Sequence, residues 1–177
     1  VWKDVTSDID PQRIVLSGDS AGGGLAVAFA SKLRDQGAPL PAGLVLVSPW
    51  LDLTADRRSD PDLVKRDVML DPDWLVAAGA AYAAGADPAD PGISPLLGSV
   101  AGLPPALVQA GTDDVLVSDA VRFARAVEEA GGSVTLSLAN GLWHDFPMQA
   151  GLLDAADRAV RQAAGFVQEV LMGADEE

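Results

Sequence analysis

The chain of 177 residues carries 12 Lys and Arg against 26 Asp and Glu, which gives a formal net charge of −14. This length is typical of one domain, and a sequence with 49% hydrophobic and only 21% charged residues can bury a core, so we do not expect a disordered protein. The acidic balance argues against a nucleic-acid partner, because phosphate binding needs clustered Lys and Arg. The absence of cysteine excludes disulfides and thiol catalysis, and a single histidine excludes a metal site built from several histidines.

Two features of the whole chain bear on its location and extent. No apolar run reaches the ~18 residues of a membrane-spanning helix, and no basic segment followed by an apolar one marks a secretory signal, so we expect no membrane span and a cytoplasmic location. The chain begins at Val1, and its first residues resemble the end of a helix. We therefore expect that an N-terminal portion of the folding unit is missing from residues 1–177.

Short apolar runs alternate with longer amphipathic segments along most of the chain. In chain order, the patterns predict a strand at 13–17, a helix at 21–36, a strand at 43–48, a helix at 72–84, a strand at 106–110, a helix at 116–130, a strand at 134–138 and a helix at 151–172. Continuous apolar strands are typical of a parallel sheet that is covered on both faces, and strand–helix alternation is typical of βαβ units. The predicted fold class is therefore α/β, with a mainly parallel sheet flanked by helices.

The region from residue 49 to residue 104 is less regular than the rest. Within it, residues 54–92 hold a charged stretch at 56–67 and a loop rich in Pro, Gly and Asp, and we interpret 54–92 as a lid or insertion. The mixed acidic and basic residues of 56–67 predict a solvated surface. The apolar residues of the helix at 116–130 are expected to form its buried face, at Val121, Ala124, Val127 and Ala130.

Residues 18–22 read Gly-Asp-Ser-Ala-Gly, which matches the Gly-x-Ser-x-Gly pattern between a predicted strand and a predicted helix. A nucleophilic serine at such a sharp turn has a strained backbone, so the two glycines make room for the turn and Ser20 projects its hydroxyl from the sheet. The helix that begins there directs free N–H groups at an oxyanion beside Ser20, with the Ala21 N–H as the expected first donor. The alternatives are a glycine-rich turn that only packs helix on strand, and a phosphate-binding loop, although neither a P-loop lysine pattern nor a dinucleotide acidic signature is present.

A serine nucleophile needs a base, and His144 is the only histidine of the chain. It follows the strand predicted at 134–138, at the sheet edge where Ser20 should emerge. The preceding strand–helix loop carries Asp113 and Asp114, and either carboxylate could accept the imidazole N–H or merely cap the next helix. The order serine, aspartate, histidine, each after a different strand, is the order of an α/β-hydrolase triad.

Five further residues flank these positions. Trp50, Leu51 and Trp143 lie in loops beside the expected site and are candidates for the walls of a substrate pocket, with burial in the core as the alternative. Asp19 and Asp145 adjoin the serine and the histidine. We expect both to be solvated loop acids, the alternative being hydrogen-bond acceptors behind the catalytic groups.

Several motifs together resemble one family. They are residues 18–24 (Gly-Asp-Ser-Ala-Gly-Gly-Gly), 48–53 (Ser-Pro-Trp-Leu-Asp-Leu), 93–96 (Ile-Ser-Pro-Leu), the segment 105–111, and 143–146 (Trp-His-Asp-Phe). In this order they resemble bacterial esterases of the hormone-sensitive lipase family. The resemblance implies an α/β-hydrolase fold and hydrolysis of carboxylic esters, commonly with short acyl chains, without a cofactor or a metal.

The resemblance also implies roles for individual residues. Ser20 corresponds to the nucleophile and His144 to the base. The acid of the family precedes a hydrophobic pair and an acidic helix start, which matches Asp114 better than Asp113, so Asp114 is the choice and Asp113 the alternative. The expected reaction is attack of Ser20 on a small-molecule ester, with an acyl-enzyme as the intermediate.

The chain departs from the family pattern in one respect. Family members carry a His-Gly-Gly-Gly-type loop upstream of the nucleophile, whose N–H groups complete the oxyanion hole, and residues 1–177 contain no such loop. We therefore interpret 1–177 as an α/β-hydrolase catalytic domain without its N-terminal part. The alternatives are a catalytically inactive fragment, a small-molecule-binding protein on the same fold and, less in keeping with the residues around the serine, a peptidase. Assembly into a homo-oligomer is left open.

Overall fold

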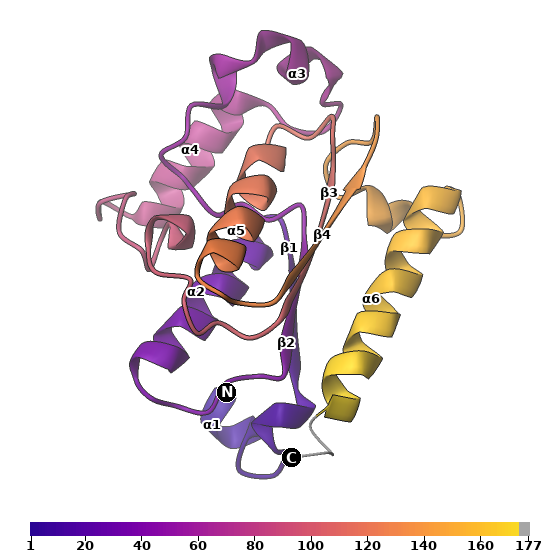
Figure 1. The fold of residues 1–177 in the computed structure, drawn as a ribbon. Helices are drawn as coiled ribbons and strands as arrows, with labels where there is room; N and C mark the ends of the chain where they lie inside the picture. The colour runs from indigo at the N-terminus through magenta and orange to yellow at the C-terminus, as the bar shows by residue number, and fades with distance from the viewer. Residues whose placement is uncertain (174–177) are drawn as a thin grey trace.

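The computed structural model describes residues 1–173, and a sheet of four strands lies at its centre (Figure 1). The strands are β1 (Val15–Asp19), β2 (Gly43–Val47), β3 (Ala106–Gly111) and β4 (Val134–Ala139). They lie in the order β1-β2-β3-β4, and every neighbouring pair is parallel. The predicted α/β fold with a parallel sheet is therefore confirmed.

The register of the sheet brings the carboxyl ends of the four strands to one edge. Gly18 pairs with Leu46, Leu46 with Val108, and Val108 with Leu136, so equivalent points of all four strands lie side by side. In parallel α/β sheets, ligand sites form outside this edge. The loops expected to carry the serine, the aspartate and the histidine all leave the sheet here.

Helices cover the sheet on both faces. The α-helices within residues 1–173 are α1 (Trp2–Val5), α2 (Ala21–Asp35), α3 (Pro61–Arg66), α4 (Pro72–Ala83), α5 (Val117–Glu129) and α6 (Asp154–Gly173). Figure 1 shows α2 and α5 on one face of the sheet and α6 on the other. None of these helices in the described part of the chain is long and apolar enough to cross a membrane.

The main core lies between the sheet and helices α2 and α5. On α5 the buried face consists of Ala120, Phe123, Ala124 and Val127, at the i, i+3, i+4, i+7 spacing of a helix that packs on one side. The predicted burial is confirmed for Ala124 and Val127. It is wrong for Val121 and Ala130, which are exposed, because a strict spacing of three residues drifts by about 60° around a helix at each step.

Two element boundaries differ from the predicted ones because short 3-10 turns precede the elements. Pro11–Arg13 forms such a turn, so β1 begins at Val15 rather than at residue 13. Phe146–Gln149 forms another, and Gly151 then adopts a φ of +86°, so α6 begins at Asp154. The other strands and helices lie within one or two residues of their predicted positions.

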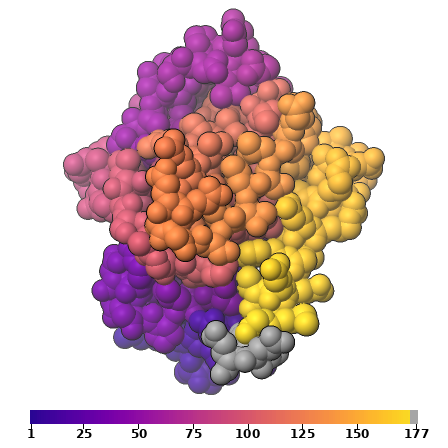
Figure 2. Space-filling model, in the orientation of Figure 1, coloured from indigo at the N-terminus to yellow at the C-terminus, as the bar shows by residue number. Residues whose placement is uncertain are grey.

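The segment with α3 and α4 lies over the carboxyl edge of the sheet, at the upper end of the molecule in Figures 1 and 2. The prediction of a solvated surface for 56–67 is wrong for two of its residues, Arg57 and Asp67, which are buried. Arg57 Nη2 lies 2.7 Å from Asp119 Oδ2, and Asp67 Oδ2 accepts a hydrogen bond of 2.9 Å from the Val115 N–H. Partners far away in the sequence compensate these charges, and the charge pattern of 56–67 does not reveal them.

Candidate active site

Ser20 occupies a sharp turn between β1 and α2 with backbone angles of φ 51° and ψ −121°, which are rare for a residue other than glycine. The Ser20 N–H donates to the Val47 carbonyl at 2.9 Å, and the Ser20 carbonyl accepts the Trp50 N–H at 2.9 Å. These two bonds to the end of β2 and its loop hold the strained conformation. A Cβ atom on Gly18 would overlap the backbone of the next helical turn, so this glycine is required, whereas a Cβ on Gly22 meets open space. Of the two glycines predicted to be essential for the turn, packing within residues 1–173 therefore requires the first alone.

The Ala21 N–H is the first of helix α2 and lies at the positive dipole end of this helix. Ala21 is exposed, and within residues 1–173 its N–H donates to no backbone or side-chain acceptor. It is thus available to a ligand atom beside Ser20, at the place where the sequence predicts an oxyanion donor.

Asp114 and His144 are brought together from the loops after β3 and β4. Asp114 Oδ2 lies 3.0 Å from His144 Nδ1, and both side chains are buried. The other oxygen, Asp114 Oδ1, accepts the Leu116 N–H at 2.8 Å near the start of α5. Of the two alternatives for this aspartate, the contact with the imidazole is present, whereas the N-cap of α5 is Leu116 and, within residues 1–173, no side chain caps this helix. Asp113 is turned away and pairs with Arg66 at 3.0 Å.

The prediction of a solvated acid is wrong for Asp145. This side chain is buried, with a left-handed backbone (φ 53°) and an N–H that donates to Ser48 Oγ at 3.1 Å. Its Oδ2 lies 3.2 Å from His144 Nε2. The backbone turn after His144 folds the carboxylate back onto the ring, and adjacency in the sequence was the only available signal. Asp19, by contrast, is exposed as predicted.

His144 thus has a carboxylate at each ring nitrogen. Burial disfavours the charged ring and lowers its pKa, but the hydrogen bonds to Asp114 and Asp145 and the charges of these carboxylates outweigh burial and raise the pKa of His144 to about 9. Within residues 1–173, no hydrogen bond joins the Ser20 hydroxyl to the ring, and Nε2 faces Asp145 instead.

A small apolar cavity of about 160 Å³ adjoins Ala21. Its walls include Trp50, as the sequence suggested, and two aromatic side chains of α4 that the sequence analysis missed, Trp74 and Tyr82. Leu51 is fully buried in the main core, which places it away from a pocket wall. Trp143 is partly buried next to the histidine but does not line this cavity.

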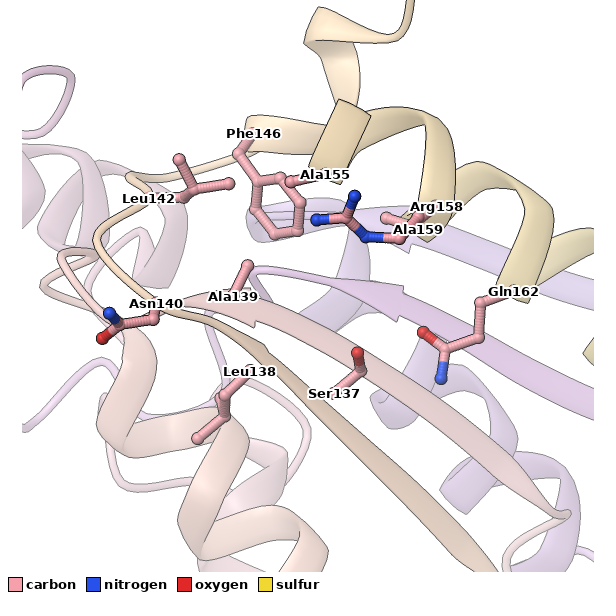
Figure 3. A pocket seen from close by; sticks show the side chains of 10 residues that line it. All are labelled: Ser137, Leu138, Ala139, Asn140, Leu142, Phe146, Ala155, Arg158, Ala159 and Gln162. Carbon is pink, nitrogen blue, oxygen red and sulfur yellow. The ribbon is translucent and has the colours of Figure 1, made fainter. Parts of the chain in front are cut away.

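Among the cavities larger than this one, two lie against the sheet. One, of about 580 Å³, opens between β4 and α6, where the side chains of Phe146, Arg158 and Gln162 surround it (Figure 3). The other, of about 680 Å³, runs along β1 between α1 and α2. Neither of them, nor the cavity beside Ala21, is lined by Ser20, Asp114 or His144. Within the described residues, no group of three or more acidic or histidine side chains is placed to hold a metal ion.

Comparisons with known proteins agree with this architecture. A profile of the alpha/beta hydrolase fold family matches residues 1–148. An acetyl-hydrolase from Streptomyces hygroscopicus is 40% identical over 158 residues, which are 89% of this chain and 53% of that protein. An esterase from Acinetobacter venetianus is 38% identical over 159 residues, which are 89% of this chain and 52% of that protein.

A crystal structure of an esterase from the bacterial hormone-sensitive lipase family superposes with a TM-score of 0.90 at 32% identity, covering 96% of this chain and 58% of that one. The chain therefore spans about half the length of the curated relatives it matches. The family resemblance read from the motifs is confirmed: the chain belongs to the alpha/beta hydrolase fold family and is similar to its hormone-sensitive lipase esterases.

Proposed function

We propose that the protein hydrolyses small carboxylic esters with short acyl chains, using Ser20 as nucleophile, His144 as general base and acid, and Asp114 as the carboxylate that orients the ring. The observation that supports this most directly is the buried Asp114–His144 pair at 3.0 Å, at the same sheet edge as a serine with a strained backbone. The relatives named acetyl-hydrolase and esterase agree with this reaction class.

In the proposed cycle, the oxygen of Ser20 attacks the carbonyl carbon of the ester while His144 Nε2 takes the serine proton. The negative charge that develops on the carbonyl oxygen is stabilised by the Ala21 N–H. His144 returns the proton to the departing alcohol, which leaves an acyl group on Ser20. Water then attacks this acyl group, His144 takes a proton from the water, and the acid is released as the serine regains its proton.

Asp114 has a supporting part in this cycle. Its Oδ2 accepts a hydrogen bond from the Nδ1–H of His144, which leaves Nε2 as the nitrogen that takes the serine proton, and its charge stabilises the imidazolium that forms. The bond from Asp114 Oδ1 to the Leu116 N–H fixes the carboxylate to the start of α5. The orientation of the ring is therefore anchored to a rigid element of the fold.

The preference for short acyl chains is inferred from the cavity beside Ala21. Its volume of about 160 Å³ is smaller than the ~300–1,000 Å³ typical of pockets for drug-sized ligands. The rings of Trp50, Trp74 and Tyr82 line it. Because α4 lies within 54–92, we infer that this segment acts as the lid or insertion of the catalytic domain and contributes to substrate selection.

The test compares hydrolysis of p-nitrophenyl acetate and butyrate by the 177-residue chain and by Ser20→Ala, with Ser133→Ala as a matched control on an exposed serine. We expect the Ser20 variant to lose at least about 10³-fold in kcat and the control to keep its rate. Labelling with a fluorophosphonate, followed by mass spectrometry, should place the adduct on Ser20. Equal rates from all three proteins would contradict the proposal, and cleavage of peptide anilides in preference to esters would favour a peptidase.

A further inference from the structure

We propose that Asp145 is a positioning residue that competes with Ser20 for His144 Nε2, so that the resting protein holds the ring in an ion pair with the Asp145 carboxylate. Its catalytic consequence rests on the proposed esterase function. The pairing itself is a property of the described chain.

The two contacts of the ring define its protonation. Asp114 Oδ2 lies 3.0 Å from Nδ1, and Asp145 Oδ2 lies 3.2 Å from Nε2. An ionised carboxylate only accepts hydrogen bonds, and a neutral imidazole has one N–H donor and one bare acceptor nitrogen. A neutral ring would therefore turn its bare nitrogen toward one of the two carboxylates. The doubly protonated ring instead places its positive charge between the two carboxylates, so this arrangement favours the imidazolium.

The imidazolium in turn stabilises the buried carboxylate of Asp145. The carboxylate is buried, and within residues 1–173 its Oδ1 has no hydrogen-bond partner, while its Oδ2 is held by the histidine. An unpaired buried carboxylate is strongly unfavourable, because burial removes its solvation. The side chain is kept at this position by its backbone, whose N–H binds Ser48 Oγ at 3.1 Å.

The pairing occupies the atom that the proposed reaction needs. Nε2 must accept the proton of Ser20, and a protonated Nε2 bound to Asp145 cannot do so. Asp114 and Asp145 are the charged groups that face the ring from the loops around it, since Asp113 is engaged by Arg66. With both carboxylates present, the pKa of His144 is raised to about 9. The fraction of free base, and with it kcat/KM, should therefore rise through pH 7 to 9.

The experiment uses the single histidine of the chain, whose ring resonances need no assignment among several candidates. The pKa of His144 is measured by NMR titration of the wild type, Asp145→Asn and Asp145→Gly. Glycine adopts the positive φ of this position without strain, so the second variant guards against a folding defect in the first. Asp19→Asn, an exposed aspartate next to Ser20, is the matched control.

We expect the ring of the wild type to titrate near pH 9 and the proton affinity of both Asp145 variants to fall at least tenfold, with Asp19→Asn unchanged. The rise of kcat/KM with pH should move to lower pH by the same amount. An unchanged titration in both Asp145 variants would overturn the pairing. A lowered pKa with an unmoved rate profile would overturn the competition with Ser20.

Failure of the proposed function has a different signature. If no protein turns over esters at any pH while the Asp145 variants still show the weakened proton binding, the esterase proposal is contradicted for this chain. The pairing of Asp145 with His144 is then supported independently of catalysis.

Discussion

Asp119 and Asp145 are both buried aspartates near the carboxyl edge of the sheet, but their surroundings differ. Asp119 accepts the Leu51 N–H at 2.9 Å and the Asp52 N–H at 3.0 Å, and both of its oxygens bind Arg57. Asp145 has His144 at one oxygen and no hydrogen-bond partner within residues 1–173 at the other. The first carboxylate is paired with a cation that stays charged at any ordinary pH, and the second with a group that titrates.

The comparison distinguishes a carboxylate whose partner is permanently charged, Asp119, from one whose partner can lose its charge, Asp145. Because arginine does not lose its proton in proteins, a rise in pH does not discharge the cation that pairs with Asp119, and Asp119 fixes the loop after β2 to helix α5. The charge on His144 is lost at alkaline pH, so the Asp145 contact is conditional. A buried carboxylate that lacks some of its hydrogen-bond partners, as Asp145 does in the described part of the chain, is therefore a candidate for a functional role.

The largest effect is expected from Asp119→Ala. The substitution leaves Arg57 buried without its counter-ion and leaves two backbone N–H groups without an acceptor, so the free energy of unfolding should fall by about 3–5 kcal/mol. Urea unfolding measures the change. Glu129→Ala is the matched control on the same helix, where an exposed pair with Arg125 is removed, and its unfolding midpoint should not move. Midpoints shifted equally by the two variants would contradict a structural role for Asp119.

Replacement of both Arg57 and Asp119 tests whether the loss of stability comes from leaving one buried charge without its partner. In Arg57→Met/Asp119→Leu no buried charge is left alone, so we expect the double variant to be more stable than Asp119→Ala, although the two N–H groups remain unpaired. The same urea experiment provides the measurement. A double variant as unstable as the sum of its single replacements would mean that the two side chains act independently.

A smaller change in the free energy of unfolding is expected when the pH is raised. The pKa of His144 is raised above its ordinary 6.5 to about 9, so its interactions contribute stability that is fully present below pH 6.5 and is lost as the pH rises through 9. The loss should be of the order of 3 kcal/mol in the wild type, since one pKa unit corresponds to about 1.4 kcal/mol. Asp145→Gly should show a smaller loss between pH 6 and pH 9, as measured by urea unfolding at each pH. The same slope in both proteins would rule out a contribution of Asp145 to it.

The smallest effect is expected from Arg122→Ala, which removes a half-exposed partner from Asp52 at 2.7 Å and should cost no more than about 1 kcal/mol at neutral pH. Burial raises the pKa of Asp52, but hydrogen bonds from Thr54 and Arg122 outweigh burial and hold this pKa below its ordinary value. The stability contributed by this carboxylate is present above pH ~4 and is lost as the pH falls through the lowered pKa. Acid unfolding of Arg122→Ala should therefore begin at higher pH than that of the wild type, whereas Arg125→Ala on the exposed face should match the wild type.

Those parts of the candidate site that follow directly from the order of strands and helices along the chain could be predicted from the sequence. The turn of Ser20 is encoded by its place between an apolar strand and a helix, and the loops of Asp114 and His144 follow from the next strands. The choice between Asp113 and Asp114 could not be made from position alone, because both lie in one loop and differ only in the direction in which their side chains point. A resemblance to family motifs favoured Asp114, and the 3.0 Å contact with His144 agrees with it.

The sequence by itself determined the alternation of strands and helices, and therefore the parallel sheet and the edge at which the serine, aspartate and histidine loops meet. Hydrophobic periodicity carries this information, because it records which residues of one element face the core. Only the tertiary structure decided that Arg57 is buried against Asp119, that Trp74 and Tyr82 wall the cavity, and that Asp145 folds back onto His144. These contacts depend on the packing of distant segments or on a single backbone turn, and neither leaves a periodic pattern in the sequence.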